Sequence, residues 1–474
     1  MATSRHPLPY GWAKSHLTLL ERDADSLTLW VSPATPRHAI AEVCRTQAVD
    51  RICPDEADSL RQRIDAAYSG SDNSAANVIS EVESAVDLSR LMQELPAIED
   101  LLETADDAPI IRMLNALLTQ AAREGASDIH IEPYERHSSV RFRVDGTLRE
   151  VVQPNKALHA ALISRLKIMA ELDIAEKRLP QDGRISLRIG NRAIDVRVST
   201  LPSAHGERAV LRLLDKSSSR LSLDRLGMSA TVRNGFGRAV QQPHGIVLVT
   251  GPTGSGKTTT LYAALSGLRT DTTNILTVED PIEYELPGIG QTQVNSRIEL
   301  SFARALRAIL RQDPDIIMIG EIRDFETAQI AVQASLTGHL VLATLHTNDA
   351  PSAVTRLADM GIEPFLLSSS LLGVLAQRLV RQLCPQCKTP APEGGWRPVG
   401  CAHCSSTGYK GRTGVYEWMA CTDGLRSHIH NRSSDQELTR AALAEGLVSM
   451  RQDGERLVQA GITSREELVR VTRE

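Results

Sequence analysis

The sequence predicts an α/β protein in which a smaller α+β domain precedes a parallel sheet covered by helices. After residue 226, short apolar runs alternate with helical segments, a pattern typical of buried parallel strands. Before that point, apolar and polar residues alternate with a period of two in residues 184–189 and 194–198, which indicates a hairpin with one buried face. The chain has 474 residues, which is enough for several domains.

The N-terminal part divides into a small module, residues 1–69, and a linker, residues 70–107. The module contains a strand-like segment at 26–31 and a helical segment at 36–45. The linker is acidic, because residues 81–107 carry nine acidic side chains and one arginine. Such a composition favours a solvated linker with weak helices, and an acidic docking segment is the alternative interpretation.

Four further segments follow in order. We predict an α+β domain at 108–225, an α/β core at 226–383, a cysteine-containing module at 384–420 and a helical C-terminal subdomain at 421–474. The α+β domain is expected to contain a helix at 109–125, strands at 129–131 and 140–144, and a helix at 156–170. Capping-box patterns at 434–437 and 463–466 predict two short C-terminal helices, and the serines at 217–219 predict a hinge.

An apolar strand at 246–250 runs into a glycine-rich turn, and a helix follows that opens with lysine and threonine. This order is the phosphate-binding P-loop, whose glycines let successive backbone N–H groups point at phosphate oxygens. Lys257 supplies a positive charge near the outer phosphates, and the Thr258 hydroxyl is a Mg²⁺ ligand. The predicted nucleotide-binding residues are Gly251, Pro252, Thr253, Gly254, Ser255, Gly256, Lys257, Thr258 and Thr259. The sequence therefore predicts that the chain binds ATP or GTP.

Carboxylates follow the next predicted strand, residues 274–278. Glu279, Asp280 and Glu283 come directly after it. Open α/β sheets bind their ligands at the carboxyl ends of the strands, so these acids are expected near the P-loop. One of them is predicted to polarise the attacking water as a general base, and solvated turn carboxylates are the alternative.

A third predicted strand ends at Glu321. Gly320 stands where an aspartate is often found, so Glu321 is the candidate for holding Mg²⁺, with water in between. The fourth predicted strand is flanked by His339 and His346. A histidine at the mouth of a strand can sense a terminal phosphate by hydrogen bonding, and His346 is the stronger candidate.

Four of the seven cysteines form the pattern C-x₂-C-x₁₃-C-x₂-C, namely Cys384, Cys387, Cys401 and Cys404. Two such pairs bring four thiolates to the corners of a tetrahedron around Zn²⁺. Because all four positions are protein ligands, the predicted zinc is structural. His403 lies between two ligands and is interpreted as a bystander.

Composition argues against nucleic acid and against a membrane span. The net charge is −5 and aromatic residues make up 3%, so neither a broad basic surface nor many stacking platforms are expected. No stretch approaches the roughly 20 apolar residues of a transmembrane helix, and residues 1–10 contain no secretion signal. We expect a cytosolic chain that a partner can hold elsewhere.

Taken in this order, the motifs closely resemble the secretion ATPases of the type II secretion and type IV pilus class. The resemblance covers roughly residues 109–474. Its marks are residues 178–184 (RLPQDGR), 206–208 (GER), 279–283 (EDPIE), the histidine box at 337–339 and 346–349, and the four cysteines followed by 407–412 (TGYKGR).

The resemblance implies a homohexameric motor that hydrolyses ATP with Mg²⁺ and carries a structural Zn²⁺. It further implies a RecA-like P-loop core and a PAS-like preceding domain, with ATP between the two. By this likeness Glu279 is the catalytic glutamate and Glu321 is the Walker B acid.

The resemblance also implies that arginines of the preceding domain reach the phosphates, some from a neighbouring subunit. Arg184 and Arg197 fit best, because they lie on the polar face of the predicted hairpin. The alternatives that remain are Arg208, Arg304, Arg307 and Arg311.

The short N-terminal module favours type II secretion over pilus assembly, since pilus-assembly relatives often carry longer N-terminal regions. The resemblance implies that this module docks on the cytoplasmic domain of an inner-membrane secretion protein, next to a polytopic platform protein. The chain would then be cytoplasmic and peripherally attached to the inner membrane. A pilus-assembly ATPase, a nucleic-acid translocase and a nucleotide-gated scaffold are the competing interpretations.

Overall fold

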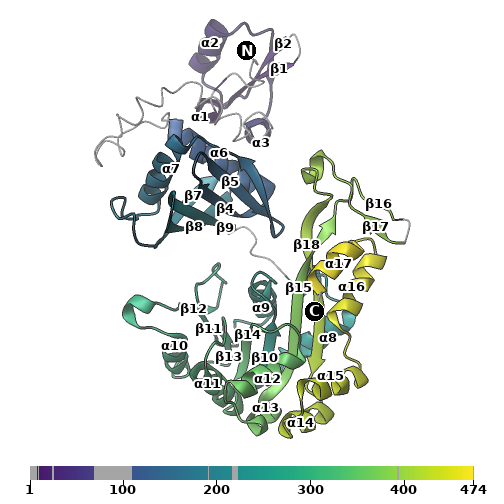
Figure 1. Cartoon of the computed structure of the whole chain (residues 1–474). Coiled ribbons are helices and arrows are strands. Elements are labelled where there is room, and N and C mark those ends of the chain that lie inside the picture. Colours follow the sequence, from purple (N-terminus) through teal and green to yellow (C-terminus); the bar gives the residue numbers. More distant parts are fainter. Residues whose placement is uncertain are drawn as a thin grey trace. The chain divides into compact units, whose positions relative to one another are not determined.

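The computed structural model describes residues 8, 10–23, 26–68, 109–189, 192–215, 222–391 and 394–472. The chain divides into two compact units, Met1–Lys216 and Ser217–Glu474, and Figure 1 labels their elements. The predicted acidic linker at 70–107 and the predicted hinge at 217–219 lie outside the described residues.

The N-terminal module is a three-stranded sheet with three helices. Its elements are α1 Tyr10–His16, β1 Thr18–Asp23, β2 Ser26–Val31, α2 Arg37–Thr46, β3 Arg51–Pro54 and α3 Ala57–Tyr68. In the order β1-β2-β3, the first pair is antiparallel and the second parallel. Adjacent residues of β1 point to opposite faces, so Leu19 packs with Leu60 and Ile64 while Leu20 packs with Val43. The predicted strand and helix of this module correspond to β2 and α2.

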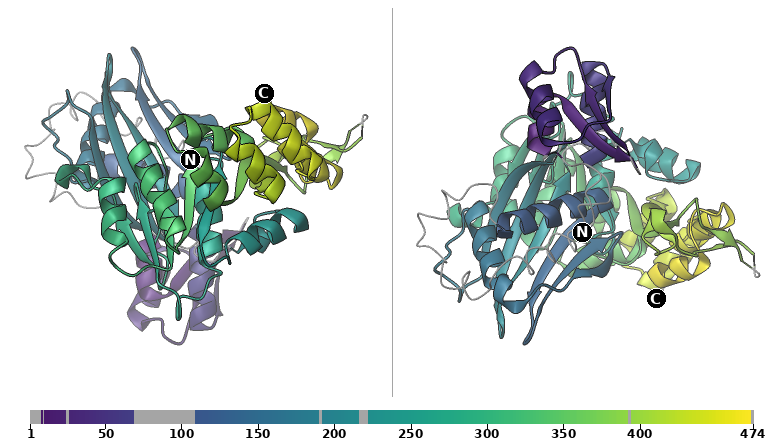
Figure 2. Two further views of the ribbon diagram at one scale, coloured as in Figure 1. Left: turned by 90° about the horizontal axis from the view of Figure 1, so that it is seen from below. Right: turned by 90° about the horizontal axis from the view of Figure 1, so that it is seen from above.

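The rest of the first unit is a six-stranded antiparallel sheet with helices on one face. Its elements are α6 Pro109–Glu124, β4 Ala126–Pro133, β5 Ser138–Val144, β6 Thr147–Val152, α7 Lys156–Met169, β7 Gln181–Ile189, β8 Arg192–Ser203 and β9 Gly206–Asp215. The strand order is β6-β5-β4-β9-β8-β7. Both α6 and α7 pack on one face of this sheet (Figures 1 and 2). This face carries Ile129, Phe142 and Val196. The opposite face carries charged side chains.

The second unit is built on a seven-stranded sheet in the order β12-β11-β13-β14-β10-β15-β18. All neighbouring pairs are parallel except β15 and β18. Its strands are β10 Gly245–Thr250, β11 Ile275–Glu279, β12 Gly290–Gln293, β13 Ile316–Ile319, β14 Leu340–Leu345, β15 Leu371–Leu383 and β18 Tyr409–Ala420. The α/β class predicted from the alternation of apolar runs and helices is confirmed.

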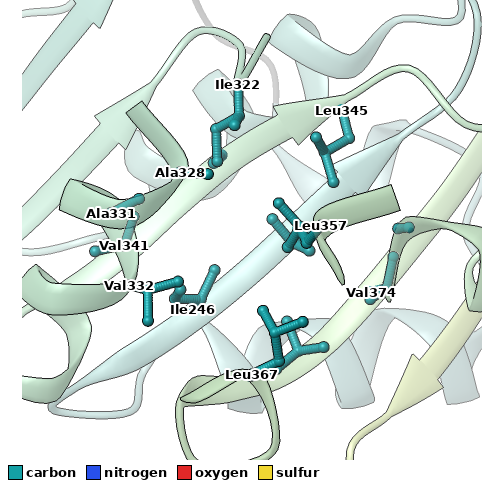
Figure 3. Close-up of a cluster of buried hydrophobic side chains, with 14 of the residues drawn as sticks. Ile246, Ile322, Ala328, Ala331, Val332, Val341, Leu345, Leu357, Leu367 and Val374 are labelled. Atoms are coloured by element: carbon teal, nitrogen blue, oxygen red, sulfur yellow. The ribbon is translucent and has the colours of Figure 1, made fainter. Parts of the chain in front are cut away.

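Helices cover both faces of this sheet. They are η3 Leu223–Arg225, α8 Ala230–Ala239, α9 Lys257–Leu265, η4 Ser296–Ile298, α10 Phe302–Ile309, α11 Phe325–Leu336, α12 Pro351–Asp359, α13 Pro364–Ser370, α14 Asp423–His430, α15 Asp435–Ala444, α16 Met450–Gln459 and α17 Arg465–Thr472. On one face α10 to α15 pack on alternate strand residues such as Ile246 and Val341, and Figure 3 shows part of this core. On the other face α8 and α9 pack on Val247 and Val249.

The strands β15 and β18 form a long hairpin that carries the cysteine module. The hairpin pairs Gly373 with Ala420 and Leu383 with Tyr409. Helices α16 and α17 lie beside it (Figure 1) and pack on it through Leu457 and Leu468. Because β18 belongs to the core sheet, the part of the predicted module 384–420 outside the sheet is 384–408, where the short strands β16 Thr389–Pro390 and β17 Trp396–Arg397 and the turn η5 Ala402–Cys404 lie.

Two sequence-based boundaries need correction. The predicted α+β domain extends to residue 225, but the units divide after Lys216, and Leu223 packs into the core of the second unit. The capping box predicted at 463–466 is wrong, because Ser464 caps α17 by accepting a hydrogen bond from Glu467 N at 3.2 Å. The box predicted at 434–437 is confirmed at the start of α15.

Among the residues described, none of the helices has the length and apolar character needed to span a lipid bilayer.

Candidate nucleotide-binding site

The P-loop connects the buried strand β10 to helix α9. Lys257 is the first residue of α9, and Gly256, with φ of 88°, precedes it in the left-handed conformation. Gly251 also requires glycine, because a Cβ there would lie 2.4 Å from the Gln377 carbonyl oxygen. Thr258 and Thr259 stand half-buried in the first turn of the helix. The loop therefore has the shape that exposes N–H groups and a helix N-terminus to an anion.

Lys257 folds back onto this loop. Its Nζ donates hydrogen bonds to the carbonyl oxygens of Gly251, at 2.8 Å, and Pro252, at 3.2 Å. Burial lowers the pKa of Lys257 to about 8, although the nearby carboxylate of Glu321 favours the charged form. Phosphate oxygens bring negative charge to this position, so their binding would favour the protonated lysine.

Gln377, on β15, forms hydrogen bonds that support the P-loop. Its Nε2 donates to the Ser255 carbonyl oxygen at 2.7 Å, and its Oε1 accepts from the Thr260 hydroxyl at 2.8 Å. The side chain is 2% exposed. Sequence reasoning missed this residue, because nothing in the local pattern of β15 indicates which loop its amide contacts.

A second group of charged side chains lies at the carboxyl ends of β13 and β14. Glu321 forms an ion pair with Arg323 and lies 3.5 Å from His346, measured from Oε2 to Nε2. Burial lowers the pKa of His346, and the charge of Lys257 lowers it further, so the imidazole is neutral at pH 7. The sequence prediction named Glu321 and His346 but missed Arg323, although it stands only two residues after Glu321.

The two predicted histidines lie at opposite ends of strand β14. His346 follows the carboxyl end of β14, and its neighbour Thr347 donates its backbone N–H to Thr250 Oγ1 at 2.9 Å. His339 precedes the other end of β14, where its carbonyl oxygen accepts from Gly245 N at 3.1 Å. A full strand length, about 20 Å at about 3.3 Å per residue, separates His339 from the P-loop edge. In the structure His346 therefore lies close to Glu321, and His339 lies far from both residues.

Glu279 ends β11 and is 2% exposed. Its Oε1 accepts hydrogen bonds from Thr277 Oγ1, at 2.7 Å, and Gln291 Nε2, at 3.0 Å. Its Oε2 accepts a hydrogen bond from the hydroxyl of Tyr262, on α9. Asp280, the next residue, is exposed. The side chain of the predicted catalytic glutamate therefore lies on the face of the sheet that α9 covers, where its oxygens accept hydrogen bonds from protein donors.

The predicted arginines of the first unit lie on the charged face of its sheet. Arg184 and Arg197 are direct cross-strand partners, and Arg212 of β9 is the next residue in the same row. Arg208 forms a 2.6 Å ion pair with Glu132, which also binds Arg141. Like charges placed directly opposite destabilise a sheet, and Asp128 balances part of this row by pairing with Arg212 at 3.0 Å.

The alternative arginines of the second unit lie on and after α10. Arg304, Arg307 and Arg311 are all exposed there. Arg307 forms an ion pair with Glu326 of α11.

The four predicted zinc ligands converge. The sulfur atoms of Cys384, Cys387, Cys401 and Cys404 all lie within 4.8 Å of one another. The separation is 3.9 Å between the sulfurs of Cys384 and Cys401 and 3.8 Å between those of Cys387 and Cys404. Zn–S bonds of about 2.3 Å in a tetrahedron place sulfurs about 3.8 Å apart, so the donor set fits zinc.

Comparisons with known proteins agree with these features. A family model described as "Type II/IV secretion system protein" matches residues 103–470. The Pseudomonas aeruginosa type II secretion system protein HxcR is 63% identical and aligns over 98% of this chain and 99% of its own length. The type II secretion system protein E of the same organism is 56% identical, over 98% of this chain and 96% of its own.

The Vibrio cholerae type II secretion system ATPase E is 60% identical over 82% of this chain and 80% of its own length. Among solved structures, the pilus retraction motor PilT with bound ADP has a TM-score of 0.53 and 26% identity, over 76% of this chain and 96% of its own. The Legionella pneumophila ATPase DotB, at 22% identity, shares the fold with a TM-score of 0.59, over 76% of this chain and 94% of its own. The resemblance inferred from the motifs is confirmed, and the chain belongs to the type II/IV secretion system protein family.

Proposed function

We propose that this chain is an ATPase that drives protein export through a type II secretion system. The observation that carries the proposal is the meeting of Lys257, Glu321 and His346 at the carboxyl ends of the parallel strands β10, β13 and β14. That edge is where open α/β sheets bind ligands. The names of the relatives with the same motifs favour type II secretion over pilus assembly.

Each residue has a proposed role in phosphoryl transfer. The P-loop N–H groups and Lys257 would bind the phosphates, and His346, neutral at pH 7, would donate or accept a hydrogen bond at the terminal phosphate. Thr258 and Glu321 would hold Mg²⁺, which would neutralise charge on the phosphates. Glu279 is the proposed general base for the attacking water.

The proposed assembly is a homohexamer in which Arg184 and Arg197 contribute charge to the phosphates. Their direct pairing across β7 and β8 supports this, because two neighbouring guanidinium groups can bind one phosphate together. The N-terminal module, with its own sheet and two small cores, is the proposed docking part. It would hold the motor on an inner-membrane partner, on the cytoplasmic side.

The experiment that tests the enzyme is Mg²⁺-dependent ATP hydrolysis by the full chain and by Lys257→Ala. Removing a charge aimed at the transferring phosphate is expected to lower kcat by about 100-fold or more. Lys156→Ala is the control, because the Lys156 ammonium makes an exposed hydrogen bond to the Glu135 carbonyl oxygen in the first unit. Turnover of the Lys257 variant at the parent rate would contradict the P-loop assignment.

The cellular role is tested by expression in a Pseudomonas aeruginosa strain that lacks HxcR. The parent chain is expected to restore export by that secretion system, and Lys257→Ala is expected to restore none. Restoration of pilus assembly in a strain lacking its own pilus ATPase, without restored export, would favour the competing interpretation.

A further inference from the structure

Glu279 is a carboxylate whose acceptor capacity is largely used by the protein. A carboxylate has about four lone-pair positions that can accept hydrogen bonds. In Glu279 three of them accept hydrogen bonds from donors on three elements. Tyr262 comes from α9, Gln291 from β12 and Thr277 from the same strand as Glu279. With 2% of its surface exposed, the residue has almost no contact with solvent.

This arrangement does not suit a general base. A base must lie within about 2.6–3.2 Å of the water from which it takes a proton. In the structure the positions nearest to the Glu279 oxygens are taken by a hydroxyl, an amide and a second hydroxyl. The one acceptor position left, on Oε2, is closed to solvent because the residue is 2% exposed, so activity through Glu279 requires the groups around Oε2 to move.

Tyr262 is the donor that is linked most directly to the P-loop. It lies on α9, five residues after Lys257, so a rigid helix joins the tyrosine to the phosphate-binding turn. Its ring is fully buried and packs edge to face on Tyr284, with 4.7 Å between the ring centres. Burial and the neighbouring Glu279 carboxylate raise the pKa of Tyr262, so its hydroxyl keeps its proton and remains a donor.

The Tyr262 hydroxyl also connects the loop after β11 to the same helix. Its oxygen accepts hydrogen bonds from Gln291 Nε2, at 3.3 Å, and from Glu283 N, at 3.4 Å. Gln291 in turn donates to the Tyr284 carbonyl oxygen and accepts from Leu286 N. A displacement of α9 would therefore disturb the environment of Glu279 and of this loop together.

We propose that Tyr262 is a positioning residue whose hydrogen bond holds Glu279 away from the attacking water, so that this bond has to break in the ATP-bound chain before the reaction. The inference rests on the proposed ATPase function and concerns what keeps its turnover slow. No proton moves in this step, because the tyrosine only withdraws its hydrogen bond. The free carboxylate oxygen then turns to water.

The test compares ATP hydrolysis by the full chain with that of Tyr262→Phe. The variant keeps the ring and removes only the hydroxyl. Its kcat is expected to rise about tenfold, which corresponds to an activation free energy that is lower by about 1.4 kcal/mol. The KM for ATP is expected to stay the same, since no contact to the nucleotide is removed. The same substitution combined with Glu279→Gln is expected to lose the gain.

Tyr284→Phe is the matched control, because the Tyr284 ring packs on Tyr262 but its hydroxyl makes none of the three hydrogen bonds to Glu279. Its kcat is expected to equal that of the parent. Thermal unfolding checks that each variant is folded. If Tyr262→Phe is unfolded, Gln291→Leu removes a different donor to Glu279 and decides the question, with a smaller expected gain.

Two results overturn the inference while leaving the proposed function intact. The first is a parent that hydrolyses ATP and a folded Tyr262→Phe, or its substitute Gln291→Leu, whose kcat is equal or lower. The second is a gain that persists when Glu279 is replaced by Gln. A parent chain that hydrolyses no ATP would instead overturn the proposed function, and the inference with it.

Discussion

At the scale of single residues, the candidate site separates groups that carry charge from groups that hold them in place. Lys257 and Glu321 belong to the first kind, and both are recognised from their places in short motifs. Gln377 belongs to the second kind, since its amide bonds the P-loop through Ser255 and α9 through Thr260. A buried amide that satisfies two buried partners contributes to stability mainly because its loss would leave them without hydrogen bonds.

Gln377→Ala is expected to lower the free energy of unfolding of the second unit by about 1–3 kcal/mol and to weaken ATP binding. The Ser255 carbonyl and the Thr260 hydroxyl would lose their partner, and the P-loop would lose its support. Chemical denaturation and nucleotide titration measure the two effects. Gln382→Ala on the same strand removes only an exposed hydrogen bond to Arg412 O and serves as control. Equal losses in both variants would contradict the role of Gln377.

At the scale of elements, helix α17 is attached to β15 by one buried carboxylate. Glu467 accepts hydrogen bonds from Arg470 at 2.6 Å, from Arg381 Nη2 at 2.8 Å and from the backbone N–H of Arg381 at 3.0 Å. Burial alone would raise the pKa of Glu467, but these hydrogen bonds outweigh it and lower the pKa to about 2. The sequence pattern of α17 predicts an amphipathic helix. It does not indicate that Glu467, in the first turn of this helix, binds Arg381 of β15, which lies more than eighty residues earlier in the chain.

Because the pKa of Glu467 is lower in the folded state than its usual value of 4.5, its contribution to stability is present above pH 4.5 and is lost as the pH falls towards 2. Glu467→Gln is expected to destabilise the chain by about 2 kcal/mol at pH 7. The difference from the parent should shrink between pH 4.5 and 2. Denaturation curves at several pH values measure it, with Glu455→Gln, at a more exposed ion pair, as control. A difference independent of pH would contradict the ionic contribution.

At the scale of the whole molecule, the cysteine module is tied to distant parts of the second unit. Lys388 Nζ donates to the Gly461 carbonyl oxygen at 2.6 Å, and the Tyr409 and Ser464 hydroxyls lie 2.7 Å apart. These bonds join the end of the β15–β18 hairpin to α16 and α17. The long strand β15 continues from this end to Gln377 beneath the P-loop. Loss of order at the cysteines would thus affect the packing of the C-terminal helices.

The parent chain is expected to contain one zinc per molecule, and Cys401→Ser is expected to lose it. Because the metal joins 384–387 to 401–404, its loss should lower the melting temperature of the second unit by about 4 °C or more. Elemental analysis and thermal unfolding with and without a chelator check both results. Cys44→Ser, at an exposed cysteine of the N-terminal module, is the control. Full zinc content in Cys401→Ser would exclude the four-cysteine site.

The amino-acid sequence by itself determined the P-loop motif and the four cysteines that converge, because each of these features lies in short, nearly contiguous motifs. It also determined the α/β class, since the period of the apolar residues distinguishes buried strands from helices. The tertiary structure alone decided that His346 lies close to Glu321, while His339 lies at the other end of β14. It also decided that Glu279 is enclosed by Tyr262 and Gln291 and that Gln377 supports the P-loop. The physical reason is that these contacts depend on strand order and register, which bring together side chains up to 122 residues apart.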